Sequence, residues 1–132
     1  MRVLMSMTIG LLLTGPAFAE DQSICPDAQT TIEIGECVSK EYDKADAELN
    51  SVWKKVMATF EKNDTMPAKD LKAWKETLLA SQRDWVKFKE QDCDAVGYEW
   101  FGGTGRSNAL VFCLLDHTTA RTKDLKARFF ER

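Results

Sequence analysis

The sequence contains a single histidine and no G-x-S-x-G motif, so it has little of what a hydrolase needs. Hydrolytic catalysis requires a nucleophile activated by a base, or two carboxylates with separated pKa values, held in a pocket. The one histidine, His117, follows Asp116 within a predicted helix, where a surface or boundary position is expected. Acidic side chains are numerous, and we expect most of them to be solvated. We therefore predict a protein that is not an enzyme and that carries no cofactor.

Long apolar runs are missing as well. The longest one, residues 5–13, is well short of the roughly 20 residues that a membrane-spanning helix needs. Arg2 precedes this run and a small-x-small triplet at 17–19 follows it, which is the arrangement of a secretory signal. We predict a signal peptide over residues 1–19 and a single exported domain over residues 20–132, located in the periplasm or secreted.

Basic residues are outnumbered by acidic ones. The chain has 18 lysines and arginines against 21 aspartates and glutamates, and its net charge is −3 with histidine neutral. Removal of the predicted signal would take away Arg2 and no acidic residue, which makes the charge more negative. A negative protein is repelled by the phosphates of nucleic acids and is attracted to basic partners. The composition therefore argues against nucleic-acid binding and favours a basic protein partner.

The cysteines include no close C-x-x-C pair, which makes a metal site such as zinc the weaker use of them. Four follow the predicted signal, at Cys25, Cys37, Cys93 and Cys113, and an even number in an oxidising compartment is typical of two disulfides. No cysteine stands at the cleavage point, so we expect no lipid anchor. Three pairings are possible. We favour Cys25–Cys37 with Cys93–Cys113, because each bond then closes a short segment.

Apolar residues recur every three or four positions in three stretches, and no stretch alternates as a β-strand would. The first predicted helix runs from Thr31 to about Phe60, and Thr30 with Glu33 forms a capping box at its start. The positions that carry its helical spacing are Val38, Tyr42, Ala45, Leu49, Val52, Val56 and Phe60.

The second predicted helix starts near Pro67, which fits a first turn, and extends to about Ala95, before Gly97 stops it. A third helix begins at Ser107 or Asn108. Its spacing is carried by Leu110, Cys113, Leu114, His117, Arg121, Leu125 and Phe129. The predicted fold class is all-α: a three-helix, up-down-up bundle with long first and second helices, stapled by two disulfides.

Two groups of residues beside the predicted core are expected to serve the fold. The first is a stripe of three tryptophans at positions 53, 74 and 85, which we expect to be core. The second consists of Asp46, Asn50, Gln82 and Arg121, which lie on three helices and can meet across the bundle. Because Arg121 offers several donors and Asp46 can accept two hydrogen bonds, we interpret this group as a structural polar network in preference to a ligand site.

The loop between the second and third predicted helices is the best candidate for partner binding, because the helices are expected to leave mostly polar outer faces. Its candidate contact residues are Tyr98, Trp100, Phe101, Gly102, Gly103, Thr104 and Arg106. Glycines let the backbone approach a partner, and aromatic side chains are frequent in binding hot spots. An alternative remains open, in which Trp100 and Phe101 fold back over the disulfide end and only Tyr98 is exposed.

Several short motifs follow one another along nearly the whole predicted mature chain. They are Thr30-x-x-Glu33-x-x-x-Cys37, Tyr42-x-x-Ala45-Asp46-x-x-Leu49-Asn50-x-x-Trp53, Gln82-x-x-Trp85-x-x-Phe88-x-x-x-x-Cys93, Gly102-Gly103, Cys113 and Thr118-x-x-Arg121-x-x-x-Leu125. This ordered set resembles the LprI-type lysozyme inhibitor family of small exported bacterial proteins. The resemblance implies an all-helical periplasmic or secreted domain whose named activity is inhibition of lysozyme.

The chain also departs from the family pattern in ways that concern its target more than its fold. Lys89-Glu90 stands where Arg-Asp is usual, Thr104 replaces the serine after the paired glycines, and the lipid anchor of the family's namesake is missing. Two hypotheses follow. The first is an inhibitor that blocks a muramidase by non-covalent contact, with acidic charge steering a basic enzyme. The second is an exported interaction module whose envelope or host partner is unrelated to lysozyme.

Overall fold

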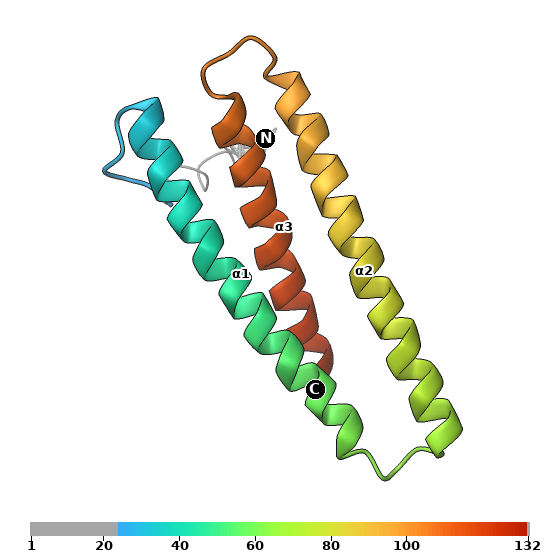
Figure 1. Ribbon diagram of the computed structural model, residues 1–132. Helices are drawn as coiled ribbons and strands as arrows, with labels where there is room; N and C mark the ends of the chain where they lie inside the picture. Colours follow the sequence, from blue (N-terminus) through green and yellow to red (C-terminus); the bar gives the residue numbers. More distant parts are fainter. Residues whose placement is uncertain (1–23, 132) are drawn as a thin grey trace, which may run out of the picture.

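Three helices make up most of residues 24–131, the part of the chain that the computed structural model describes. They are α1 (Thr31–Glu61), α2 (Ala68–Glu99) and α3 (Arg106–Phe129). Successive helices alternate in direction, so the predicted all-α, up-down-up architecture is confirmed (Figure 1). The predicted signal peptide lies outside the described residues. Among the helices that are described, none combines the length and the apolar character needed to cross a membrane.

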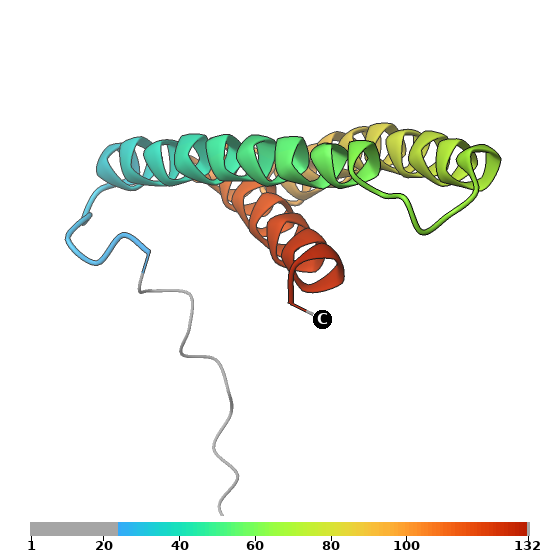
Figure 2. The ribbon, with the colours of Figure 1, turned by 90° about the horizontal axis from the view of Figure 1, so that it is seen from below.

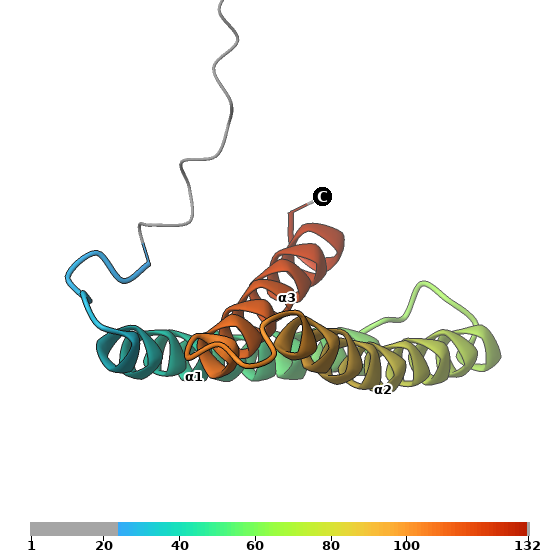
Figure 3. The ribbon, with the colours of Figure 1, turned by 90° about the horizontal axis from the view of Figure 1, so that it is seen from above.

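Helix α3 holds the bundle together. It packs extensively against α1 and also against α2, whereas α1 and α2 touch each other little. Views from below and above show α1 and α2 in one layer, with α3 crossing that layer on one face (Figures 2 and 3). The core must therefore lie mainly between α1 and α3, with α2 added along the side of α3.

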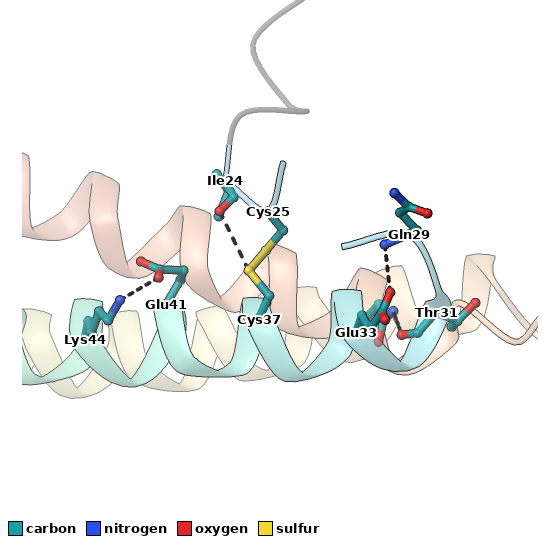
Figure 4. The surroundings of a disulfide bond; sticks show 9 residues. Ile24, Cys25, Gln29, Thr31, Glu33, Cys37, Glu41 and Lys44 are labelled. Atoms are coloured by element: carbon teal, nitrogen blue, oxygen red, sulfur yellow. Dashed lines mark hydrogen bonds and ion pairs between the residues drawn. A yellow bond between two sulfur atoms is a disulfide. The ribbon is translucent and has the colours of Figure 1, made fainter. Parts of the chain in front are cut away.

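The start of α1 is fixed by the predicted capping box. The Thr30 side chain accepts a hydrogen bond from the backbone N–H of Glu33 at 3.2 Å. In return, the Glu33 carboxylate accepts hydrogen bonds of 2.9 Å from the backbone N–H groups of Gln29 and Thr30 (Figure 4). These bonds from Gln29 and then Thr30 favour the charged carboxylate and lower the pKa of Glu33. The capping box is confirmed.

Apolar side chains from all three helices form one core cluster. Its buried members are Leu49, Val52, Val56, Phe60, Leu78 and Leu125. At one end of the cluster, the Trp74 ring meets Phe60 edge-on at 4.6 Å and stacks on Phe129 at 6.0 Å between ring centroids. Trp74 nevertheless stays 38% exposed, and Trp53 and Trp85 are only partly buried against the cluster. The tryptophans therefore lie at the edge of the buried cluster, and the expectation that all three are core is wrong for Trp74.

Helix α2 runs past the glycine that was expected to stop it. Gly97 is buried inside α2, which ends at Glu99 and not at Ala95. A Cβ atom built on Gly97 would lie 3.6 Å from Cδ1 of Leu110, an ordinary van der Waals distance, so Gly97 packs beside α3. At this position the helix continues for two residues beyond the glycine, despite the weak helix propensity of that residue. Smaller differences occur at the other ends: Pro67 caps α2 instead of opening it, and α3 begins at Arg106, before the expected start at Ser107 or Asn108.

Both favoured disulfides are present, and no other cysteine lies in the described chain. Cys25–Cys37, with Cα atoms 6.1 Å apart, ties the segment before α1 back onto that helix (Figure 4). Cys93–Cys113, with Cα atoms 5.5 Å apart, joins the last turns of α2 to the first turns of α3. The second bond therefore restrains both ends of the connection between α2 and α3.

Candidate partner-binding surface

The connection between α2 and α3 is shorter than expected. Tyr98 belongs to the last turn of α2 and Arg106 opens α3, so only residues 100–105 lie between the two helices. Two hydrogen bonds of 3.0 Å shape the turn, from the N–H of Phe101 to the Tyr98 carbonyl and from the N–H of Gly103 to the Trp100 carbonyl. Gly102 adopts a φ of 81°, a left-handed conformation that favours glycine. The connection is thus a tight turn in which Gly102 supplies a left-handed backbone conformation.

The three aromatic side chains at this turn face solvent. Tyr98 is 66% exposed, Trp100 is 53% exposed and Phe101 is 76% exposed. Trp100 leans its ring on Gly105, where an added Cβ would lie 3.5 Å from the ring, and this contact leaves about half of the side chain accessible. The alternative in which Trp100 and Phe101 are buried over the disulfide end does not occur.

Arg106 organises these rings. Its guanidinium carbon lies 4.9 Å from the centroid of the Tyr98 ring and 5.7 Å from that of the Phe101 ring. A cation near an aromatic face is attracted by the ring quadrupole, so Arg106 attracts both exposed rings, one from the last turn of α2 and one from the connection. We call Tyr98, Trp100, Phe101 and Arg106 the aromatic loop surface. Thr104 and the paired glycines Gly102 and Gly103 lie exposed in the turn beside it.

An apolar groove continues from the aromatic loop surface along the helices. It has a volume of about 570 Å³ and is lined by Val96, Trp100, Ala109, Phe112, Cys113, Asp116, His117 and Ala120. Beyond it, Phe88 is exposed and meets the His117 ring edge-on, with the ring centroids 5.5 Å apart. The expectation of mostly polar outer helix faces is therefore wrong for the face where α2 meets α3. The apolar residues on this face at positions 88 and 96 of α2, and at position 100 directly after it, recur at helical spacing and could have indicated it.

The four residues of the predicted polar network form two separate pairs. Asn50 donates a hydrogen bond of 2.9 Å to the Asp46 carboxylate, within α1. Arg121 donates one of 3.0 Å from Nε to the Gln82 side-chain carbonyl, across the contact of α3 with α2. The ion-pair partner of Arg121 is Asp124 on its own helix, at 3.1 Å, and among the described residues no hydrogen bond joins the two pairs. Asp46 and Arg121 are thus not brought together.

Lys89, one of the departures from the family pattern, is a buried cation whose place in the packing was not predicted. Its side chain is only 6% exposed, and its Nζ donates a hydrogen bond of 3.3 Å to the Tyr42 hydroxyl. The same atom lies 5.4 Å from the centroid of the Tyr42 ring and 5.2 Å from that of Trp85. Arg121 lies near the same tryptophan ring, at 5.8 Å, and burial lowers the pKa of this guanidinium. Both cations pack between helices. For Lys89, its position four residues after Trp85 on α2 was a signal that the sequence offered.

Comparisons with known proteins agree with the motif order. The family described as lysozyme inhibitor LprI matches residues 25–125, which include all four cysteines. A protein of Rhizobium meliloti (strain 1021), itself described as uncharacterized, is 29% identical over 125 residues, covering 92% of this chain and 90% of that protein. No solved structure matches. The match over most of the described chain shows that this protein belongs to the lysozyme inhibitor LprI family.

Proposed function

We propose that this protein is exported and inhibits a lysozyme by non-covalent contact through the aromatic loop surface. Family membership supports the activity, because the family is described by lysozyme inhibition. Two disulfides support export, since such bonds persist in oxidising compartments. The observation that carries the choice of surface is the exposure of Tyr98, Trp100 and Phe101 at one disulfide-restrained turn.

The aromatic loop surface is suited to tight contact because it is already ordered. Binding is weakened by the entropy lost when side chains and loops are immobilised. Here the Cys93–Cys113 bond restrains the ends of the turn, and the Arg106 guanidinium holds two of the rings. Aromatic side chains also bring large contact areas with few rotatable bonds. The ordering cost of binding should therefore be small.

The charge of the surface suits a muramidase cleft. Such enzymes generally cleave a glycosidic bond with two carboxyl groups that flank it. Arg106 presents a guanidinium between two aromatic rings, and guanidinium groups bind carboxylates with two parallel hydrogen bonds. The net charge of −3 over the whole chain meanwhile favours approach to a basic enzyme. In this proposal the acidic body steers the encounter and the cationic turn occupies the cleft.

The test is a lysozyme assay on bacterial cell walls with the purified protein added at increasing concentration. We expect the rate of wall lysis to fall to a plateau at saturating inhibitor, and a sample with reduced disulfides to inhibit less. If wall lysis were unaffected at inhibitor concentrations well above that of the enzyme, the proposed inhibition would be rejected. The second hypothesis, an interaction module for another envelope or host protein, would then take its place.

The contact surface is tested by the double substitution Tyr98→Ala with Trp100→Ala. We expect inhibition to weaken by more than tenfold, a loss above about 1.4 kcal/mol, because two aromatic anchors are removed. Ile32→Ala with Met66→Ala is the matched control, because both residues are exposed apolar side chains outside the aromatic loop surface. Circular dichroism should show unchanged helical content in both variants. Equal inhibition by the two variants would show that the contact with lysozyme lies on another face of the protein.

A further inference from the structure

His117 lies directly beside the Cys93–Cys113 disulfide. One ring nitrogen of His117 and the two sulfur atoms all lie within 4.8 Å of one another. Cys113 and His117 are separated by four residues on α3 and therefore share one helix face, while Cys93 comes from α2. Among residues 24–131, this is the one group of three such side chains that is close enough to share a metal ion.

We propose that reduction of this disulfide converts the group into a binding site for one thiophilic divalent cation such as Zn²⁺, held by Cys93, Cys113 and His117. Two thiolates and an imidazole are the ligands that zinc prefers, and a fourth position is filled by a carboxylate or water in many sites. A disulfide offers no thiolate, so the oxidised protein has no such site. The proposal does not depend on the binding of lysozyme.

Asp92 strengthens the assignment. Its Oδ2 lies 2.9 Å from Nε2 of His117. Histidines that bind metals commonly hydrogen-bond a carboxylate, which fixes the orientation of the ring. Asp92 also precedes Cys93 in the chain, so the same turn of α2 supplies a ligand and its supporting group. The arrangement around Cys25–Cys37 lacks a histidine, since His117 is the one histidine of the sequence.

The metal ion has a path to this site. Cys113 and His117 line the apolar groove between α2 and α3, which opens to solvent, whereas Cys93 is fully buried behind them. An ion entering the groove meets His117 and Cys113 first. Asp116 also lines the groove and stands next to His117 in sequence, so a further carboxylate is close to the entrance.

The chemistry balances with a dithiol or phosphine as reductant. Two electrons and two protons convert the disulfide to two thiols; a dithiol reductant becomes a disulfide, and a phosphine becomes its oxide with the oxygen of water. Binding of the cation then releases both thiol protons, because only thiolates are ligands. Affinity should consequently fall as the pH is lowered.

The experiment is a titration with Co²⁺, whose visible and near-ultraviolet absorption reports thiolate ligands and tetrahedral geometry. The purified protein is reduced with a phosphine in the absence of oxygen, and the oxidised protein serves as the control. We expect one Co²⁺ per chain in the reduced protein, absorption typical of thiolate ligation, displacement by Zn²⁺, and none of these in the oxidised protein. Failure of the reduced protein to give this absorption would overturn the proposal.

Two variants locate the site. Cys25→Ser with Cys37→Ser should bind Co²⁺ as the reduced wild type does, whereas His117→Ala should bind at least tenfold more weakly with an altered spectrum. The proposed site would be rejected if His117→Ala bound Co²⁺ as tightly as the wild type. It would also be rejected if the Cys25/Cys37 variant lost Co²⁺ binding. Helical content is followed throughout. A reduced chain that is unfolded both with and without Co²⁺ would equally reject the site.

Discussion

Cations packed against aromatic rings recur at the residue scale. Lys89 lies against Tyr42 and Trp85 in the bundle, and Arg106 lies against exposed rings at the turn. A buried cation is costly unless other groups compensate for lost hydration. In Lys89 a hydroxyl and two ring faces supply that compensation, while the aliphatic stem fills space between helices. Some basic side chains of this acidic protein therefore contribute to packing.

Lys89→Ala is expected to lower the free energy of unfolding by about 1–3 kcal/mol, because stem packing and the ring contacts disappear together. Urea denaturation followed by circular dichroism measures the change. Lys87→Ala provides the control, since Lys87 is an exposed lysine on the same helix, and its effect should stay within about 0.5 kcal/mol. Matching effects of the two substitutions would mean that the buried cation contributes nothing specific.

The capping box makes the start of α1 sensitive to acid. The pKa of Glu33 is lowered in the folded protein by hydrogen bonds from the backbone of Gln29 and Thr30. A carboxyl with a lowered folded-state pKa stabilises the fold above its unfolded pKa, and this contribution is lost as pH falls through the folded value. Melting temperatures should therefore drop more steeply on acidification in wild type than in Glu33→Gln. The exposed Glu36→Gln variant should follow the wild-type curve, and parallel curves for all three proteins would contradict the assignment.

At the element scale, the helices, the capping box and the favoured cysteine pairing were predictable from the sequence. The helices and the capping box depend on residues close in sequence, and each disulfide closes a short segment. The end of α2 was not predictable in this way. Glycine in a helix is unfavourable locally, and the sequence does not reveal that Gly97 lies buried within α2 beside Leu110 of α3. The exposure of the three aromatic residues at the turn was likewise left open, since burial depends on tertiary packing.

Gly35 in α1 illustrates the same limit and allows a test. A Cβ atom there would lie 2.8 Å from Oδ1 of Asn108, whose Nδ2 donates a hydrogen bond of 2.8 Å to the Thr31 carbonyl. Helix propensity alone predicts that Gly35→Ala stabilises by about 1 kcal/mol. We expect the contact with Asn108 to cancel that gain, and the gain to return in an Asn108→Ala background.

A double-mutant cycle by urea denaturation measures this coupling. The coupling energy between positions 35 and 108 should be about 1 kcal/mol, in the range found for residues in direct contact. Additive effects would indicate that Asn108 moves aside without losing its bond to the Thr31 carbonyl. The bond matters beyond this site, because it joins the first turn of α3 to the first turn of α1.

At the scale of the whole molecule, α3 is the element on which the other two depend. It packs against both α1 and α2, which touch each other little. The two disulfides therefore differ in what they hold. Cys93–Cys113 fastens α2 to α3, whereas Cys25–Cys37 fastens a short segment outside the helices to α1. The aromatic loop surface lies at the end of the bundle that the Cys93–Cys113 bond restrains.

This asymmetry predicts unequal losses when each bond is removed. Without Cys93–Cys113, the unfolded chain gains the freedom of a 20-residue separation while the folded bundle gains little, so Cys93→Ala with Cys113→Ala should cost about 3 kcal/mol. Without Cys25–Cys37, the segment before α1 gains conformational freedom in the folded state as well as in the unfolded state. The two entropy gains therefore largely cancel in the free energy of unfolding. Cys25→Ala with Cys37→Ala should therefore cost less than about 1 kcal/mol, a value typical of changes outside the core. Urea denaturation of both variants decides the matter, and equal losses would show that the segment before α1 is an integral part of the bundle.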